Sequence, residues 1–335
     1  MTLPLLPERL DLGHVREAAR RIAGHVKKTP VLHLDALDAV AGVALFLKSE
    51  NMQRIGAFKA RGAMHAVGRL TEAERARGVV TFSSGNHAQA VALAAKTYAA
   101  KAYIAMPVDA PAVKVAGVRA LGGEITFAGT TSTERHEAAL AIVHATGATM
   151  IPPFDDPHVV AGQGTATLEL FEQVLDETGA NLDAVVVPVG GGGLVAGACL
   201  VAAAYGARIF GAEPDSSDAL AQSLAAGERV TIAASNTIAD GLKPVQVGEL
   251  NLAIARDHQV ESVRVSDDEI GRAFATLLFH GKTLVEPSGA AAAAAAFARK
   301  LPRGLARVGV VLSGGNVGGD TVCGLLAKYA PHAVD

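Results

Sequence analysis

The chain has 335 residues, of which 50% are hydrophobic and 19% charged, and this composition excludes an intrinsically disordered protein. A net charge of −3 excludes the basic surface that nucleic-acid binding requires, so we expect no nucleic-acid partner. The length suggests two domains or one large one.

The sequence contains few features that indicate the cellular compartment of the protein. The two cysteines, Cys199 and Cys323, are too few for a disulfide framework and favour free thiols in a reducing compartment. The N-terminus lacks a basic start followed by an apolar run, which argues against a signal peptide. No apolar run reaches the length of a membrane span. We therefore expect a cytoplasmic protein with no membrane partner.

Short apolar strands alternate with helices along nearly the whole chain. Strands are expected at 43–48, 79–82, 102–106, 123–127, 149–151, 184–189, 208–212 and 308–312. Helices are expected at 11–27, 59–70, 88–97, 112–121, 132–145, 162–177, 194–204 and 267–281, with a packed alanine-rich helix at 290–296 and irregular structure at 230–250. This alternation predicts an α/β protein with two open, mostly parallel twisted sheets that carry helices on both faces.

The predicted strands divide between two domains. Residues 71–154 are expected to form a small α/β domain, and residues 1–70 and 155–335 a larger domain built from both ends of the chain. Ligands bind beyond the carboxyl ends of parallel strands, so we expect the site in the cleft between the two domains.

A lysine stands at the first loop-to-helix junction. The predicted strand runs into a polar loop that ends in Gly56, Ala57 and Phe58, and Lys59 and Arg61 follow at the helix start. Lysine amines form Schiff bases with carbonyl cofactors once a site lowers their pKa. Taken alone, a solvated lysine is the commoner explanation of such a residue.

The glycine run Gly190–Gly193 lies between a predicted strand and a helix. Its backbone N–H groups, backed by the helix N-terminus, would form a cup for a phosphate. A dinucleotide fingerprint also fits, because Gly191, Gly193 and Ala196 match G-x-G-x-x-A and Glu213 could bind a ribose. The second interpretation implies an NAD-dependent oxidoreductase.

Two further polar turns follow strands. The turn from Ser83 to His87 offers hydroxyls, an amide and an imidazole at a helix N-terminus, which suits a substrate carboxylate. The turn from Ser313 to Asn316 offers a neutral hydroxyl. Three polar turns and one lysine together meet the needs of pyridoxal phosphate carrying an amino acid.

Seven stretches then match one family in order and spacing over nearly the whole chain. They are GAFKARGA around Lys59, SSGNHAQAVALAAK from Ser83, MPVDAPAVKVAG from Met106, IPPFDDPHVVAGQGTA from Ile151, GGGGLVAG from Gly190, VEPSGA from Val285 and SGGNV from Ser313. With these stretches the chain resembles the threonine/serine dehydratase and serine racemase group of fold-type II pyridoxal-phosphate enzymes. The resemblance implies a fold like that of the tryptophan synthase β subunit and a homodimer or homotetramer.

The resemblance also implies roles for individual residues. Lys59 would carry the cofactor pyridoxal 5′-phosphate and Phe58 would lie against its ring. The phosphate would bind at Gly190, Gly191, Gly192, Gly193 and Leu194, the ring hydroxyl at Asn86 and the ring nitrogen at Ser313, while Gly241 and Glu286 would line the cofactor. Ser83, Ser84, Asn86 and His87 would face the substrate carboxylate. Ser84 would be the acid/base on the face opposite Lys59.

The resulting prediction is an ammonia-lyase that converts a small-molecule β-hydroxy amino acid, L-threonine or L-serine, to a 2-keto acid and ammonia. Serine racemase and 3-hydroxyaspartate ammonia-lyase are the alternatives within the family. Outside it stand the NAD-dependent oxidoreductase and a non-catalytic amino-acid binder, and the intact Lys59 argues against the latter.

A metal site is the last expectation. Metal-using relatives place a glutamate after the strand that follows the phosphate-loop helix, then a backbone carbonyl and an aspartate. Here Glu213 and Ser217 match, but the aspartate position is Ala219, and Asp218 lies beside it out of register. We therefore expect a weak or absent site for magnesium or calcium.

Overall fold

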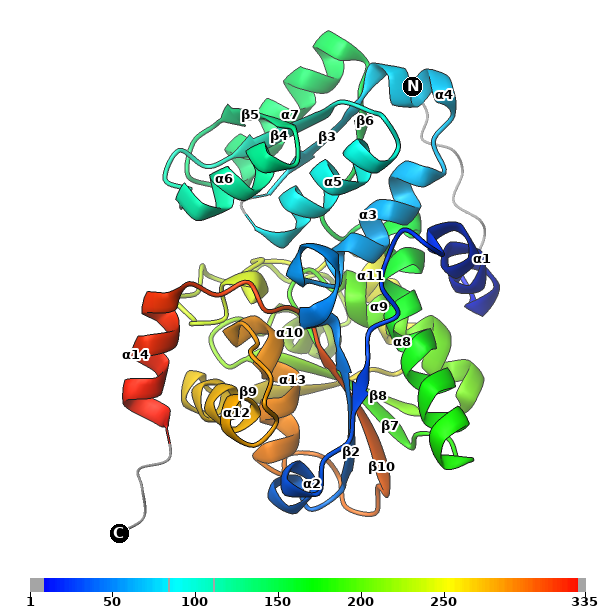
Figure 1. Cartoon of the computed structure of the whole chain (residues 1–335), viewed down its shortest axis with the longest axis vertical. Helices are drawn as coiled ribbons and strands as arrows, with labels where there is room; N and C mark the ends of the chain where they lie inside the picture. Colours follow the sequence, from blue (N-terminus) through cyan, green and yellow to red (C-terminus); the bar gives the residue numbers. More distant parts are fainter. Residues whose placement is uncertain (1–8, 84, 111, 331–335) are drawn as a thin grey trace.

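A computed structural model describes residues 9–83, 85–110 and 112–330 of the chain. Two sheets with their helices form an upper and a lower part in Figure 1. Residues 1–8, 84, 111 and 331–335 lie outside the described chain.

The lower part is built on a six-stranded sheet whose strands come from both ends of the chain. Its order is β1-β2-β10-β7-β8-β9, and only β1 runs antiparallel to its neighbour. The bounds are Val31–Leu32 (β1), Ala44–Ser49 (β2), Arg307–Leu312 (β10), Ala184–Pro188 (β7), Arg208–Pro214 (β8) and Glu261–Val265 (β9).

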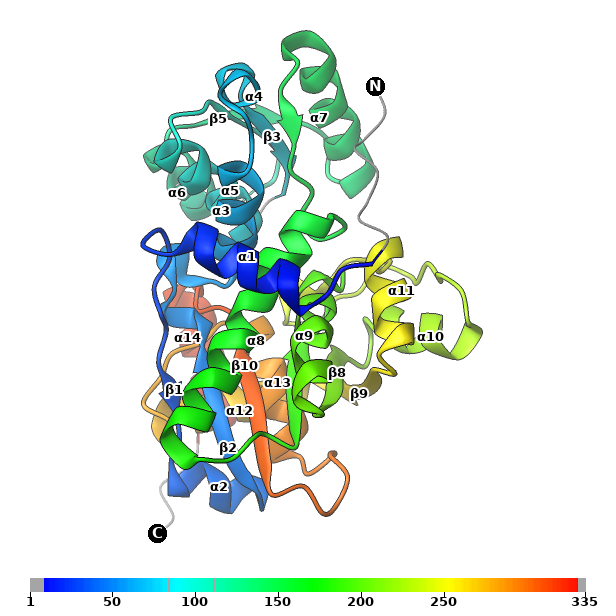
Figure 2. The same cartoon turned by 90° about the vertical axis from the view of Figure 1, so that its right-hand side faces the viewer.

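Helices cover both faces of this sheet because its strands are apolar on both sides. Val185 and Val187 of β7 pack with one helix layer, whereas Ala184 and Val186 pack with the other. The first layer contains α1 (Leu12–Ile22), α8 (Pro157–Thr178), α9 (Gly193–Ala202), α10 (Ala219–Ala226) and α11 (Glu249–Asp257). The second contains α2 (Asp35–Ala41), α12 (Asp267–Phe279), α13 (Pro287–Phe297) and α14 (Gly319–Tyr329). Figure 2 shows α1 lying across α8.

The upper part is a four-stranded parallel sheet of order β5-β4-β3-β6. Its strands are Val79–Phe82 (β3), Ala102–Met106 (β4), Gly123–Phe127 (β5) and Thr149–Met150 (β6). The helices around it are α3 (Lys59–Gly68), α4 (Glu72–Arg77), α5 (Asn86–Thr97), α6 (Ala112–Ala120) and α7 (Ser132–Thr146). Met64 and Val67 of α3 share a buried cluster with α5 and this sheet, so α3 extends from the lower part into the upper part.

The predicted fold class is confirmed, while some boundaries differ. The long helix α8 begins at Pro157 rather than residue 162, because Asp156 caps it by accepting hydrogen bonds from the N–H groups of His158 and Val159. Residues 219–226 and 249–257 form helices and 261–265 a strand that were not expected. Short 3₁₀ turns complete the chain at Glu50–Met52 (η1), Arg54–Gly56 (η2), Ala203–Tyr205 (η3) and Asp240–Leu242 (η4). Within the described ranges, no helix combines the length and the apolar character that crossing a membrane requires.

Candidate active site

The turns after β2 and β10 meet at one edge of the six-stranded sheet, because the two strands are parallel neighbours. Ala57 and Gly314 form an isolated antiparallel bridge. The Phe58 N–H donates to the Ser313 carbonyl at 3.0 Å, and the Gly315 N–H donates to the Gly56 carbonyl at 2.9 Å. The predicted ring-nitrogen residue therefore lies beside the loop that carries the predicted cofactor lysine.

This loop contains two residues with left-handed backbone angles. Ile55 has φ +57°, which a β-branched residue rarely adopts, and Gly56 has φ +70°. The amide of Asn316 lies where a side chain on Gly56 would be, and it donates to the Ile55 carbonyl at 2.7 Å. Ile55 is thus held in an unfavourable backbone conformation four residues before Lys59, as is common at functional sites.

Lys59 is the first residue of α3, and its amine is removed from water. Its Nζ donates to the Pro153 carbonyl at 2.6 Å and lies 5.0 Å from the centre of the Phe58 ring. Burial lowers the pKa of this amine from 10.5 to about 8. An amine with this pKa is partly neutral at physiological pH and can act as a nucleophile or base.

The glycine run forms a cradle at the start of α9. Among the described residues, nothing accepts a hydrogen bond from the N–H groups of Gly190 to Leu194. The Phe154 ring lies against Gly191 so closely that a side chain there would overlap it. Asn251 fixes the run by donating to the Gly191 carbonyl at 2.8 Å. Five consecutive unpartnered amides at a helix N-terminus form an anion site that suits a phosphate.

Two side-chain hydrogen bonds link Asn86, at the start of α5 in the upper part, to Glu286 and Asn316 of the lower part. Asn86 Nδ2 donates to Glu286 Oε1, and Asn316 Nδ2 donates to Asn86 Oδ1, both at 2.8 Å. Glu286 is 6% exposed. Burial, and secondarily the charge of Asp240, raise the pKa of its carboxyl to about 8, against the hydrogen bond from Asn86.

The remaining predicted site residues lie at three places. Ser83 directly follows β3, and its Oγ accepts from the Gly85 N–H at 3.2 Å. His87 is buried and donates from Nε2 to the Ile151 carbonyl at 3.0 Å, while burial and the charge of Lys59 lower its pKa to about 3. Gly241 donates its N–H to Ser288 Oγ at 2.9 Å. Ser84 lies outside the described residues.

Both carboxylates predicted to bind a metal are already engaged with protein groups. Glu213 accepts from the N–H groups of Leu220 and Ala221 and from Ser262 Oγ, at 2.8–2.9 Å. Ser217 Oγ donates to the Leu242 carbonyl, and Asp218 pairs with Arg264 at 3.3 Å. The described ranges contain no group of three or more acidic, histidine or cysteine residues arranged to hold an ion. These side chains do not fit a metal site.

Two cavities lie elsewhere. One of about 290 Å³ lies between α1, α3 and α8, and one of about 490 Å³ lies beside α10. Neither is lined by Lys59 or by the glycine run. The side chains and unpartnered amides around Lys59 are therefore the stronger indication of the active site.

Several groups that build this site were not among the predicted residues. They are the Pro153 carbonyl, Phe154 against the glycine run, Asn251 beneath it and Ser288 beside Gly241. They come from loops and helices far from Lys59 in the chain. Pro153, Phe154 and Ser288 lie in stretches that carry the family resemblance but were given no role, and no pattern marks Asn251.

The residues present fit pyridoxal phosphate. The unpartnered amides of Gly190–Leu194 suit its phosphate, and the amine of Lys59 suits its aldehyde. Ser313 places a buried hydroxyl residue beside the Lys59 loop. The dinucleotide interpretation has no comparable support, because the Glu213 carboxylate that would bind a ribose is already occupied.

Comparison with known proteins agrees with this chemistry. Residues 22–314 match the family described as "Pyridoxal-phosphate dependent enzyme". The chain is 42% identical to the L-threo-3-hydroxyaspartate ammonia-lyase of Saccharomyces cerevisiae, over 91% of this chain and 93% of the relative. It is also 42% identical to a serine racemase of Oryza sativa subsp. indica, over 92% and 91%.

A solved structure agrees as well. The processed form of threonine deaminase isoform 2 from Solanum lycopersicum superposes with a TM-score of 0.85 at 32% identity, covering 97% of this chain and 94% of that chain. The chain therefore belongs to the pyridoxal-phosphate dependent enzymes of fold type II, the group of serine racemases and of threonine and hydroxyaspartate ammonia-lyases, and its cofactor is pyridoxal 5′-phosphate.

Proposed function

We propose that the chain is an ammonia-lyase that removes water and then ammonia from a β-hydroxy amino acid, L-threonine or L-serine, and releases a 2-keto acid. The observation that carries the proposal is Lys59, whose amine is desolvated and has a pKa of about 8. Such an amine can remove a proton from the α-carbon near neutral pH.

The other site residues would position cofactor and substrate. The N–H groups of Gly190–Leu194 hold the phosphate, Phe58 lies against the ring, and Asn86 and Ser313 bind the ring hydroxyl and the ring nitrogen. The N-terminus of α5, with Ser83, Ser84, Asn86 and His87, binds the substrate carboxylate. Since the His87 side chain already donates to Ile151, its backbone N–H is the better candidate for this contact.

Pyridoxal phosphate, when bound, withdraws electrons from the α-carbon of the amino acid. Lys59 takes the α-proton, and the β-hydroxyl then leaves with a proton as water. The enamine product adds water and loses ammonia to give the keto acid. Residues 71–154 would form the domain that closes over the substrate, and we expect a homodimer or homotetramer.

Serine racemisation is the second candidate. A rice relative named serine racemase is as similar to this chain as the yeast hydroxyaspartate ammonia-lyase. Racemisation needs a proton donor on the face opposite Lys59, and Ser84 is the residue proposed for it. The third candidate substrate is 3-hydroxyaspartate.

Product analysis tests the proposal. Purified protein with pyridoxal phosphate is incubated with L-threonine, L-serine and both diastereomers of 3-hydroxyaspartate, and keto acids, ammonia and D-serine are measured. Release of 2-oxobutanoate or pyruvate with equal ammonia supports the proposed activity. D-serine without keto acid, or oxaloacetate from 3-hydroxyaspartate alone, would replace it with one of the alternatives.

Lys59→Ala is the matched control. The variant should lose the yellow colour of a lysine-bound cofactor as well as all keto-acid release. Borohydride reduction of the wild-type protein, followed by peptide mapping, should label Lys59, and a label on another lysine would refute its assignment.

A further inference from the structure

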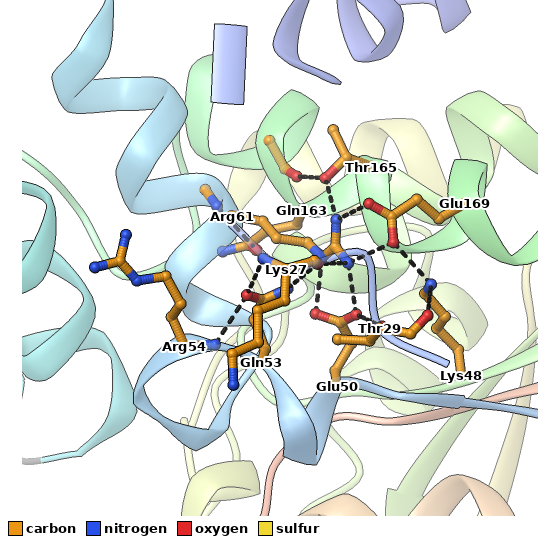
Figure 3. Close-up of polar contacts among 12 residues, drawn as sticks. Lys27, Thr29, Lys48, Glu50, Gln53, Arg54, Arg61, Gln163, Thr165 and Glu169 are labelled. Atoms are coloured by element: carbon orange, nitrogen blue, oxygen red, sulfur yellow. Dashed lines mark hydrogen bonds and ion pairs between the residues drawn. The ribbon is translucent and has the colours of Figure 1, made fainter. Parts of the chain in front are cut away.

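A cluster of four charged side chains lies beneath the start of α3. It consists of Lys48, Glu50, Arg61 and Glu169, and Figure 3 shows how their side chains converge. Lys48, Glu50 and Arg61 are 0% exposed. Two cations and two anions balance within the cluster, so no net charge is buried.

Arg61 is the centre of this cluster. Its Nε and Nη2 donate to the two oxygens of Glu50, both at 2.7 Å. Its Nη1 and Nη2 donate to the two oxygens of Glu169, both at 2.8 Å. The planar guanidinium is thus held in two directions at once, by η1 on one side and α8 on the other.

Stability alone does not explain such a cluster. Removing four charges from water is costly, and buried ion pairs often stabilise a fold no better than apolar side chains of the same volume. An arginine whose guanidinium makes paired hydrogen bonds to two carboxylates also fixes the direction of the backbone that carries it.

That backbone is the first turn of α3. Arg61 follows Lys59 by two residues, and the N-cap position Phe58 makes no side-chain hydrogen bond to the helix. The adjacent Gly62 touches Gly162 of α8 so closely that a Cβ on Gly162 would lie 2.6 Å from the Gly62 Cα. The first turn of α3 is therefore held against α8 by backbone contact at the glycines and by the Arg61 fork to Glu169.

We infer that Arg61 is a positioning residue for Lys59. Through Glu50 and Glu169 it holds the first turn of α3 against α8, and this keeps Lys59 Nζ against the Pro153 carbonyl that precedes α8. The functional meaning rests on the proposed role of Lys59 as the cofactor lysine.

The test compares Arg61→Lys with Lys48→Met. A lysine keeps the charge at position 61 but lacks the planar fork. Lys48→Met also removes a buried member of the cluster, one that binds Glu169 at 2.7 Å, yet it leaves both forks of Arg61 intact. Both variants should unfold at lower temperature, so the second serves as a control for lost stability.

The decisive measurement is the titration of Lys59 in protein freed of its cofactor. The rate at which an acylating reagent labels Lys59, measured against pH by peptide mass analysis, gives the pKa of the amine. In Arg61→Lys this pKa should rise by roughly one unit from its value of about 8, because the loosened turn lets water reach the amine. The Kd for pyridoxal phosphate should also rise at least about tenfold. In Lys48→Met neither quantity should change.

Equal changes in the two variants, or no change of the Lys59 pKa in Arg61→Lys, would overturn the inference. If Arg61→Lys does not fold, Glu169→Gln carries the same test, because a glutamine can accept only one of the two Arg61 hydrogen bonds. A smaller shift of the Lys59 pKa in the same direction is then expected, and its absence refutes the positioning role. Wild-type protein that fails to bind pyridoxal phosphate would refute the proposed function, while the labelling comparison would still decide the role of Arg61.

Discussion

Burial favours the uncharged forms of two residues at the site. It lowers the pKa of Lys59 to about 8 and raises the pKa of Glu286 to about 8. Near neutral pH the lysine can therefore accept a proton, whereas the glutamic acid keeps one and can donate a hydrogen bond. Such opposite shifts are typical of acid and base groups in enzyme sites.

Replacing Ser84 should separate the two candidate reactions. Racemisation needs a proton delivered to the face opposite Lys59, whereas elimination from L-serine does not. We expect Ser84→Ala to reduce racemisation by about 100-fold or more, the usual effect of losing a general acid, and to reduce elimination much less. Rates of D-serine and pyruvate formation in the same sample measure both effects.

Ser83→Ala is the control, since the neighbouring serine is assigned only to the substrate carboxylate. It should slow both reactions to a similar extent. An equal loss of both reactions in Ser84→Ala would instead assign Ser84 to carboxylate binding or to structure.

Residues with a local signal could be predicted from the sequence, whereas their partners could not. Lys59 follows a glycine-containing loop, and the glycine run separates a strand from a helix, so both stand out along the chain. Pro153, whose carbonyl accepts from Lys59, and Glu169, which pairs with Arg61, become neighbours only when α3 packs on α8. Contacts between segments that are far apart in the chain leave no periodic pattern in the sequence.

At the scale of elements, the strands were easier to predict than the helix ends. Five residues of β4 and five of β5 agree with the expected ranges, because apolar strands in a parallel sheet are bounded by polar turns. The start of α8 was misplaced because Asp156 and Pro157 were assigned to a loop, although an aspartate N-cap followed by a proline is a common way to begin a helix. Helices α10 and α11 and strand β9 were not predicted, whereas the irregular structure expected at 230–250 is present up to Gly248, apart from the 3₁₀ turn η4.

Helix α10 depends on a glutamate rather than on a metal. The carboxylate of Glu213 accepts from two N–H groups in the first turn of α10, those of Leu220 and Ala221. Glu213→Leu removes this acceptor and should lower the free energy of unfolding by roughly 1–3 kcal/mol, the usual cost of leaving buried donors unpaired. Thermal or denaturant unfolding measures the loss.

Chelation tests the alternative. Adding EDTA to the wild-type protein, or adding magnesium or calcium afterwards, should leave its melting temperature unchanged. A large loss of stability on chelation, restored by metal in the wild type but not in Glu213→Leu, would show that an ion does bind near this carboxylate.

At the scale of the whole molecule, α3 connects the two sheets. Its first turn is tied to η1 and α8 through Arg61, while Met64 and Val67 pack into the core of the four-stranded sheet. A movement of the four-stranded sheet relative to the six-stranded sheet would therefore act on the helix that begins with Lys59. The arrangement of two parallel sheets followed from the alternation of strands and helices, but this shared helix did not.

The buried carboxyls make the stability of the whole molecule depend on pH. Burial raises the pKa of Glu286 to about 8 and that of Glu213 to about 7, whereas both groups ionise near 4.5 in an unfolded chain. When folding raises the pKa of a carboxyl, the protein gains stability at every pH below the pKa of the unfolded chain. This gain is lost as the pH rises through the pKa of the folded protein. Burial lowers the pKa values of His65 and His87 to about 3, so these histidines make the protein more stable as the pH rises. Most of this effect is complete by about pH 6.5, the pKa of histidine in an unfolded chain.

Between pH 6.5 and 8 the two carboxyls outweigh the opposing groups, because the histidines of the unfolded chain lose their remaining protons in this range and the buried Lys59 opposes them only as the pH nears 8. The free energy of unfolding should therefore fall by roughly 1 kcal/mol. Denaturant unfolding of protein freed of cofactor measures this, since a ligand that binds the folded state would add its own pH dependence. Glu286→Gln should remove most of the decline, because an amide does not ionise and can still accept the hydrogen bond from Asn86. A Glu286→Gln variant that loses as much stability as the wild type over this range would show that the carboxyl is already ionised at pH 6.5, and that Asn86 outweighs the effect of burial.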